Sequence, residues 1–119
     1  MGKKISTYDT GDVINANENY FVQFRLTDGV DGSAVAVTDA PVILHIDGAD
    51  TQVFSGSART AISDTNLVKI TLLQGDNTIN DTTVASDNGY EDRRLIVDTF
   101  YSGGRHRQAF LYRIEYHQV

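Results

Sequence analysis

Hydrophobic and polar residues alternate along much of this chain with the spacing of β-strands. In residues 20–26 every second side chain is apolar, and residues 67–73 repeat the pattern. Residues 42–46 form a shorter, more continuous apolar stretch. A period of two places one row of side chains on the buried face of a sheet. The pattern therefore predicts strands in all three segments.

Turn-forming residues separate these segments at short intervals. Asp47-Gly48 follows the apolar stretch 42–46 and predicts a tight hairpin that leads into a strand over residues 51–54. Two weaker strands are expected over residues 34–38 and 82–85, each next to turn residues.

The clearest local pattern is a hairpin near the C-terminus. Apolar residues recur at alternate positions over 95–101 and 106–116, on either side of Gly103-Gly104. Two glycines supply the two positive φ angles of a type I′ turn without strain. With these glycines as the loop residues, Val97 is predicted to pair with Phe110.

These elements predict an all-β chain with little helix, because no segment of twelve or more residues has a clear 3.6-residue period. About eight short strands with frequent turns favour a single antiparallel β-sandwich over residues 1–119. A short N-terminal arm is expected at about residues 1–10. The pattern leaves an immunoglobulin-like and a jelly-roll topology open.

Composition narrows the possible chemistry. The chain has no cysteine, which excludes disulfides, thiolate zinc sites and cysteine nucleophiles. We find no serine-nucleophile motif and no glycine-rich phosphate loop, so we expect no enzymatic activity and no cofactor. No apolar stretch is long enough to span a membrane, and the first residues lack the apolar region of a secretory signal.

Charge is distributed unevenly along the chain. The net charge is −6, yet five arginines fall within residues 93–119. The overall negative sign disfavours nucleic acid as a partner, whereas a local basic surface suits an acidic protein. We expect the partner-binding residues to be the basic side chains near the hairpin and at the N-terminus: Lys3, Lys4, Arg93, Arg94, Arg105, His106 and Arg107.

Two Asp-Gly turns suggest an alternative function. Asp28 and Asp31 share one short loop, and Asp47 and Asp50 share another. Carboxylates in loops are the ligands that calcium prefers, although neither loop contains a complete ligand set. The alternative is a calcium-dependent adhesin or carbohydrate-binding module; otherwise we expect no metal site, because Asp is also a common turn residue.

In its length, all-β pattern and composition, the chain resembles the small β-sandwich accessory proteins of tailed bacteriophages, such as capsid decoration and head-completion proteins. The resemblance covers the whole chain but contains no diagnostic motif, so it assigns no residue. It implies a non-catalytic structural protein of the virion that stabilises the shell by protein–protein contact. The implied partners are a major capsid or other virion protein and further copies of the chain, as in a homo-oligomer.

Overall fold

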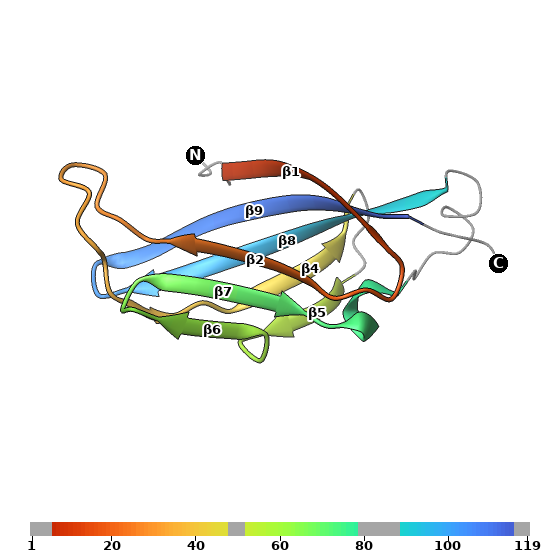
Figure 1. The fold of residues 1–119 in the computed structure, drawn as a ribbon. Helices are drawn as coiled ribbons and strands as arrows, with labels where there is room; N and C mark the ends of the chain where they lie inside the picture. The colour runs from red at the N-terminus through yellow and green to blue at the C-terminus, as the bar shows by residue number, and fades with distance from the viewer. Residues whose placement is uncertain (1–5, 48–51, 79–88, 116–119) are drawn as a thin grey trace.

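The computed structural model describes residues 6–47, 52–78 and 89–115, which form two β-sheets packed face to face (Figure 1). The elements, in chain order, are β1 (Ser6–Asn15), β2 (Tyr20–Arg25), β3 (Val37–Asp39), β4 (Val42–Ile46), β5 (Gln52–Gly56), β6 (Thr60–Ser63), β7 (Leu67–Leu72), the 3₁₀ helix η1 (Gln74–Asn77), β8 (Tyr90–Tyr101) and β9 (Gly104–Glu115). The predicted all-β sandwich with little helix is confirmed.

The strand order gives the connectivity of the two sheets. One sheet has the order β1-β9-β8-β4-β5, with β3 paired to β8, and the other has the order β2-β7-β6. The smaller sheet thus joins the second strand to the sixth and seventh, and the two sheets pack as a β-sandwich. The β1–β9 pair is parallel, whereas the other strand pairs of the described residues are antiparallel. None of the described residues forms a helix able to cross a membrane.

The core lies between the two sheets and follows the predicted alternation. Its fully buried side chains include Leu44 and Leu95 from one sheet and Ile70 from the other. The rings of Tyr20 and Tyr112 stack across the sandwich with centroids 4.4 Å apart. Aromatic rings and branched aliphatic side chains from both sheets thus exclude water from one continuous core.

The strand β1 was not predicted, and residues 6–10 of the expected arm form its first half. Its sequence is mostly polar and lacks a long alternating pattern. Hydrogen bonds hold it instead: Thr10 Oγ1 donates to the carbonyl of Leu111 at 2.7 Å, and the Tyr20 hydroxyl donates to Asp12. Burial and the bond to Asp12 raise the pKa of Tyr20 to about 12.

The β8–β9 hairpin forms as predicted, but with a different register. Tyr101 pairs with Gly104, and Leu95 rather than Val97 lies opposite Phe110. Of the two glycines only Gly104 has a positive φ, of 148°, so the turn is not of type I′. The pairing shifts by two residues, and an even shift keeps the same side chains on the buried face.

The other predicted strands differ from the observed strands in where they begin and end. The segment 34–38 contributes β3 from Val37, while Ala34 makes an isolated bridge to Thr27. The strand expected over 51–54 is β5, and β6 was not predicted. The strand over 82–85 and the second residue of the Asp47-Gly48 turn lie outside the described residues.

A buried ion pair lies within β8, and its arginine also binds the η1 segment. Arg93 is completely buried, and its Nε lies 2.7 Å from Oε1 of Glu91, which is also buried. The guanidinium also donates hydrogen bonds to the carbonyls of Asp76 and Thr78, at 2.7 and 2.6 Å. Arg93 was predicted to bind a partner; its burial removes it from any docking surface, which corrects that prediction.

Replacing Arg93 with alanine should destabilise the fold strongly. The change removes the neutralising cation from the buried Glu91 carboxylate and a donor from each of two backbone carbonyls, which costs about 3–5 kcal/mol of unfolding free energy. Urea denaturation measures it. The control is Arg25→Ala, which breaks the exposed Arg25–Asp64 pair and one hydrogen bond to Asn66 and should cost less, about 1–2 kcal/mol. Equal losses in the two variants would contradict a structural role for the buried pair.

Candidate functional site at one end of the sandwich

One end of the sandwich brings together two segments that are far apart in the sequence. Residues 26–36, between β2 and β3, project beyond the sheets, next to the β8–β9 turn at residues 101–104 (Figure 1). The pairing of Val37 with Tyr101 places the end of the β2–β3 loop beside the hairpin. We call these two segments together the sandwich end.

Two aspartates build the projecting loop. Oδ1 of Asp28 accepts the N–H of Val30 at 2.7 Å, and Oδ1 of Asp31 accepts the N–H of Ser33 at 2.9 Å. Main-chain bonds add to these, from Gly32 N–H to the Asp28 carbonyl and from Asp28 N–H to the Ser33 carbonyl, both at 2.8 Å. The hydrogen bond from Ser33 lowers the pKa of Asp31. The loop is therefore held in one conformation by its own polar groups.

This rigid loop presents an apolar side chain to solvent. Val30 is 98% exposed, the highest value among the exposed large hydrophobic residues of the described chain. Gly32, with φ of 74°, allows the backbone to return toward the sandwich. The sequence pattern did not single out Val30, because a lone valine between two Asp-Gly pairs has no periodicity.

The predicted calcium ligands are not brought together. Asp28 and Asp31 belong to the sandwich end, whereas Asp47 follows β4 and lies beside Asp92, nine residues along β8 from Tyr101. That separation is about 30 Å at roughly 3.3 Å per residue. Asp50 lies outside the described residues, and within them no three metal-ligating side chains cluster.

Strand alternation divides the predicted basic cluster at the hairpin. Arg105 and Arg107 lie on the face of the six-stranded sheet turned away from the core, which we call the outer face. His106 points to the opposite side, where its Nε2 lies 3.0 Å from Oε1 of Gln108. The three residues thus stay at the sandwich end but do not form one patch.

Asp98 partly neutralises the two arginines. Nε and Nη2 of Arg107 bind the carboxylate of Asp98 at 2.5 and 2.7 Å, whereas Arg105 is 4.0 Å away and its side chain is 50% exposed. The hydrogen bond from Arg107 lowers the pKa of Asp98 against the opposing effect of burial. Arg105 is therefore the cation at this end that is more available to a partner.

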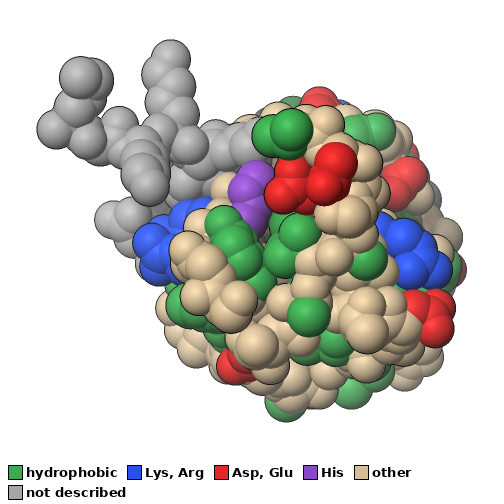
Figure 2. Space-filling view, turned by 90° about the vertical axis from the view of Figure 1, so that its left-hand side faces the viewer, with side chains coloured by type: hydrophobic (Ala, Val, Ile, Leu, Met, Phe, Trp, Pro, Cys, Tyr) green, Lys and Arg blue, Asp and Glu red, His purple; other side chains and the backbone are tan. Residues whose placement is uncertain are grey.

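A shallow hollow opens between the loop and the hairpin. It has a volume of 430 Å³, and Phe24, Leu26, Tyr101 and His106 are among its lining residues. The Tyr101 ring lies so close to the turn that a Cβ on Gly103 would meet it at 3.0 Å, so a larger residue there would require the ring to shift. Figure 2 shows this end, where hydrophobic, acidic and basic side chains and a histidine are exposed together.

Arg94 was also predicted to bind a partner, and it lies elsewhere. It is on the outer face, opposite His45 of β4 and Leu111 of β9. Lys3 and Lys4 lie outside the described residues. Of the seven predicted docking residues, the structure therefore brings Arg105, His106 and Arg107 together at the sandwich end.

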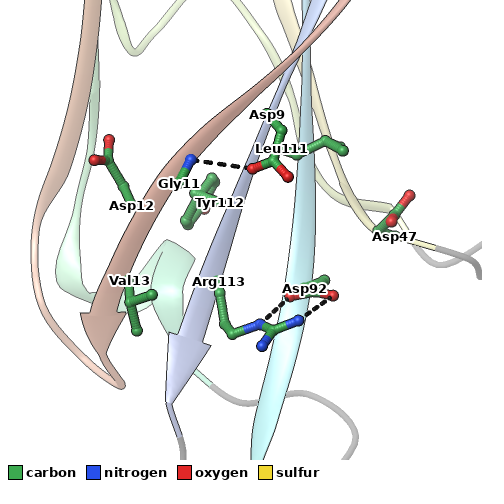
Figure 3. Close-up of a pocket in the computed structure, with 9 residues that line it drawn as sticks. All are labelled: Asp9, Gly11, Asp12, Val13, Asp47, Asp92, Leu111, Tyr112 and Arg113. Carbon is green, nitrogen blue, oxygen red and sulfur yellow. Dashed lines mark hydrogen bonds and ion pairs between the residues drawn. The ribbon is translucent and has the colours of Figure 1, made fainter.

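A second hollow lies on the outer face between β1 and β9. The register between these strands shifts between Asp9 and Val13, which opens a space of 290 Å³ lined also by Asp47, Asp92 and Arg113 (Figure 3). Arg113 binds Asp92 through Nε at 2.7 Å. Because these side chains come from four separate parts of the chain, no local sequence pattern indicated the hollow.

Comparisons with known proteins place the chain in no family. No family model matches it, and no curated protein matches it. Among solved structures, the endo-β-1,4-mannanase from Thermotoga petrophila is similar over 90% of this chain and 18% of the mannanase chain. The identity is 12% and the TM-score is 0.48. A likeness of this degree carries no argument about function.

Calcium should leave the thermal stability unchanged, because among the described residues no third metal-ligating side chain joins Asp28 and Asp31, and loop amides already bind one oxygen of each. We expect equal melting temperatures in calcium and in chelator, by differential scanning calorimetry, with magnesium as the ionic-strength control. A bound ion at 100 times its Kd would add about 2.7 kcal/mol, which raises the melting temperature by several degrees. A rise of that size with calcium alone would restore the calcium-dependent alternative.

Arg107→Ala should raise the pKa of Asp98, because the hydrogen bond is lost while burial remains. A lowered carboxyl pKa stabilises the fold above the unfolded-state value of about 4, and this contribution disappears as the pH falls through the folded pKa. The variant should therefore lose stability at pH 7 and show a smaller drop on acidification. Carboxyl ¹³C NMR measures the titration, and in Arg25→Ala that of Asp98 should be unchanged.

Proposed function

We propose that this chain is a non-catalytic structural protein that acts by protein–protein contact, and that it serves as a capsid decoration or other accessory protein of a virus particle. The observation that carries the proposal is the sandwich end, where a preorganised loop, an aromatic-lined hollow and two arginines occupy one exposed region. On this proposal the end contacts a virion protein, and the rest of the sandwich supports it.

Preorganisation favours contact through the β2–β3 loop. A flexible loop loses conformational entropy when it binds, at about 0.5–1.5 kcal/mol for each immobilised side chain. Here the Asp28 and Asp31 side chains already fix the backbone on both sides of Val30. Val30 can therefore enter an apolar socket on the partner with little further ordering.

The exposed residue types at this end and the net charge of the chain indicate what the partner's surface should contain. Aromatic residues and arginine are enriched at the centres of protein interfaces, and this end presents Phe100, 37% exposed, beside Arg105. The chain carries a net charge of −6, so most of its surface repels an acidic partner. The matching surface is an apolar socket for Val30 with a carboxylate positioned for Arg105.

Immunoglobulin variable domains offer a parallel, at the level of fold, for recognition at this end of the sandwich. In variable-type immunoglobulin domains, the loops that follow the second and eighth strands meet at one end and carry recognition. In this chain the β2–β3 loop and the β8–β9 turn meet in the same way. The parallel is one of architecture and does not identify the partner.

Reversing the charge of Arg105 and Arg107 should strongly weaken particle binding. The purified chain is mixed with virus particles isolated from the cells that produce this protein. The bound fraction is measured by sedimentation. Arg105→Glu with Arg107→Glu should lower the affinity about tenfold or more, because Glu repels the proposed carboxylates. Arg105→Glu alone, whose 4.0 Å contact with Asp98 contributes little to folding, should lower it in the same direction.

Lys69→Glu is the matched control, since Lys69 is an exposed cation on the other sheet, 5.0 Å from the Phe21 ring centroid. It should bind particles like the original chain, and far-UV circular dichroism confirms that all variants are folded. Unchanged binding by folded Arg105→Glu and double variants, or no binding by the original chain, would refute the proposal.

A further inference from the structure

The outer face of the six-stranded sheet contains an apolar strip that does not belong to the core. Ile43 of β4 and Ile96 of β8 lie side by side in register, and Leu111 of β9 lies opposite Arg94 in the next row. Ala109, opposite Ile96, is fully buried and adds no exposed surface to the strip. Ile43, Ile96 and Leu111 are only half-buried and lie outside the core cluster. Their neighbours Leu44 and Leu95 point inward and are fully buried, so alternation turns the strip toward solvent.

Arg94, beside this strip, differs from the other arginines of the described chain. Each of the others has a carboxylate oxygen within 4.0 Å, whereas Arg94 has none. Its Nε is buried and has no hydrogen-bond partner. An unsatisfied buried donor is unfavourable, more so on a charged group. A partner's acceptor would therefore meet the terminal nitrogens of this partly buried guanidinium, which lacks a carboxylate of its own, rather than the buried Nε.

The same face also carries carboxylates without an ion-pair partner. Asp92 and Asp98 are paired with Arg113 and Arg107, but among the described residues Asp9 and Asp47 form no ion pair. Oδ1 of Asp9 accepts the N–H of Gly11 at 3.0 Å, which does not neutralise its charge. Figure 3 shows Asp9 and Asp47 at separate places around the outer-face hollow, both apart from the Arg113–Asp92 pair.

We infer that the outer face binds a second copy of this chain, face to face. The face holds an unpaired cation and two unpaired carboxylates, so it is complementary in charge to itself. In a twofold contact each copy places its Arg94 against Asp9 or Asp47 of the other, and both guanidinium groups gain an acceptor. The Ile43, Ile96 and Leu111 strips are covered in the same contact, which adds a favourable apolar term.

This inference rests on the proposed function, because it names one partner of a protein that acts by contact. It concerns the part of the outer face around Arg94, away from Arg105 and Arg107 at the sandwich end. Arg94 lies four residues from Asp98 along β8, about 13 Å at roughly 3.3 Å per residue, so the two contacts can be altered separately. A dimer joined through the outer faces would present two sandwich ends to the particle.

Reversing the charges on one or the other side of the proposed dimer interface tests whether this contact forms. Solution mass is measured by light scattering across a concentration series for the original chain, for Arg94→Glu and for the double variant Asp9→Arg with Asp47→Arg. The original chain should dimerise. Each variant should be monomeric, with a dissociation constant raised about 30-fold or more, because like charges then meet across the interface. A one-to-one mixture of the two variants should form a heterodimer, because every cross-pair again has opposite charges.

Lys69→Glu is again the control and should dimerise like the original chain. A monomeric original chain, an undiminished Arg94→Glu dimer, or a mixture that stays monomeric would each overturn the inference. If the original chain is monomeric and Arg94→Glu loses particle binding, the face contacts another protein; the inference fails and the proposed function stands. If the charge exchange succeeds but no form binds particles, the inference stands and the virion proposal fails.

Discussion

Arg93 carries its charge into the interior of the sandwich, where Glu91 neutralises it at 2.7 Å and the carbonyls of Asp76 and Thr78 accept its other N–H groups. An unpaired charge in this position would be prohibitively costly, so the side chain fixes the environment around it. It ties β8 to η1, the short helix that follows β7 of the opposite sheet. One side chain thus links the two sheets.

The contacts of Arg93 also fix the register in which β8 pairs. That register decides which side chains of β8 lie on each face of the sheet. With Arg93 inside, alternation places Arg94, Ile96 and Asp98 on the outer face. A slip of one residue would exchange the two faces, burying Arg94 and exposing the ion pair. Because β8 pairs with β9 along its full length, it also aims the hairpin turn at the β2–β3 loop. The outer face and the sandwich end therefore depend on one buried interaction.

Periodicity predicted the strands that have a buried and an exposed face. The expected segments 42–46 and 67–73 correspond to β4 and β7 within one residue, because alternation reports burial directly. It missed β1, whose polar sequence is held by side-chain hydrogen bonds and by a parallel partner more than 90 residues away. The even shift of the hairpin register left its faces correct while moving each pair.

The candidate site was harder to predict, because charge and position in the sequence do not reveal burial. Arg93 and Arg94 are adjacent in the chain and look equivalent, yet one is buried in an ion pair and the other faces outward. Alternation likewise separates His106 from its two arginine neighbours. The loop aspartates suggested a metal site, but their carboxylates serve the loop's own backbone, and the exposed Val30 between them gave no signal.

The central claim is that the sandwich end is the surface that meets the particle. Hydrogen–deuterium exchange, followed by mass spectrometry on the free chain and on the chain bound to purified particles, tests it most directly. The account predicts that protection on binding is concentrated in residues 27–35 and 100–107, over the loop and the hairpin turn. Protection confined to the β2-β7-β6 sheet, with unchanged exchange at these two segments, would contradict it.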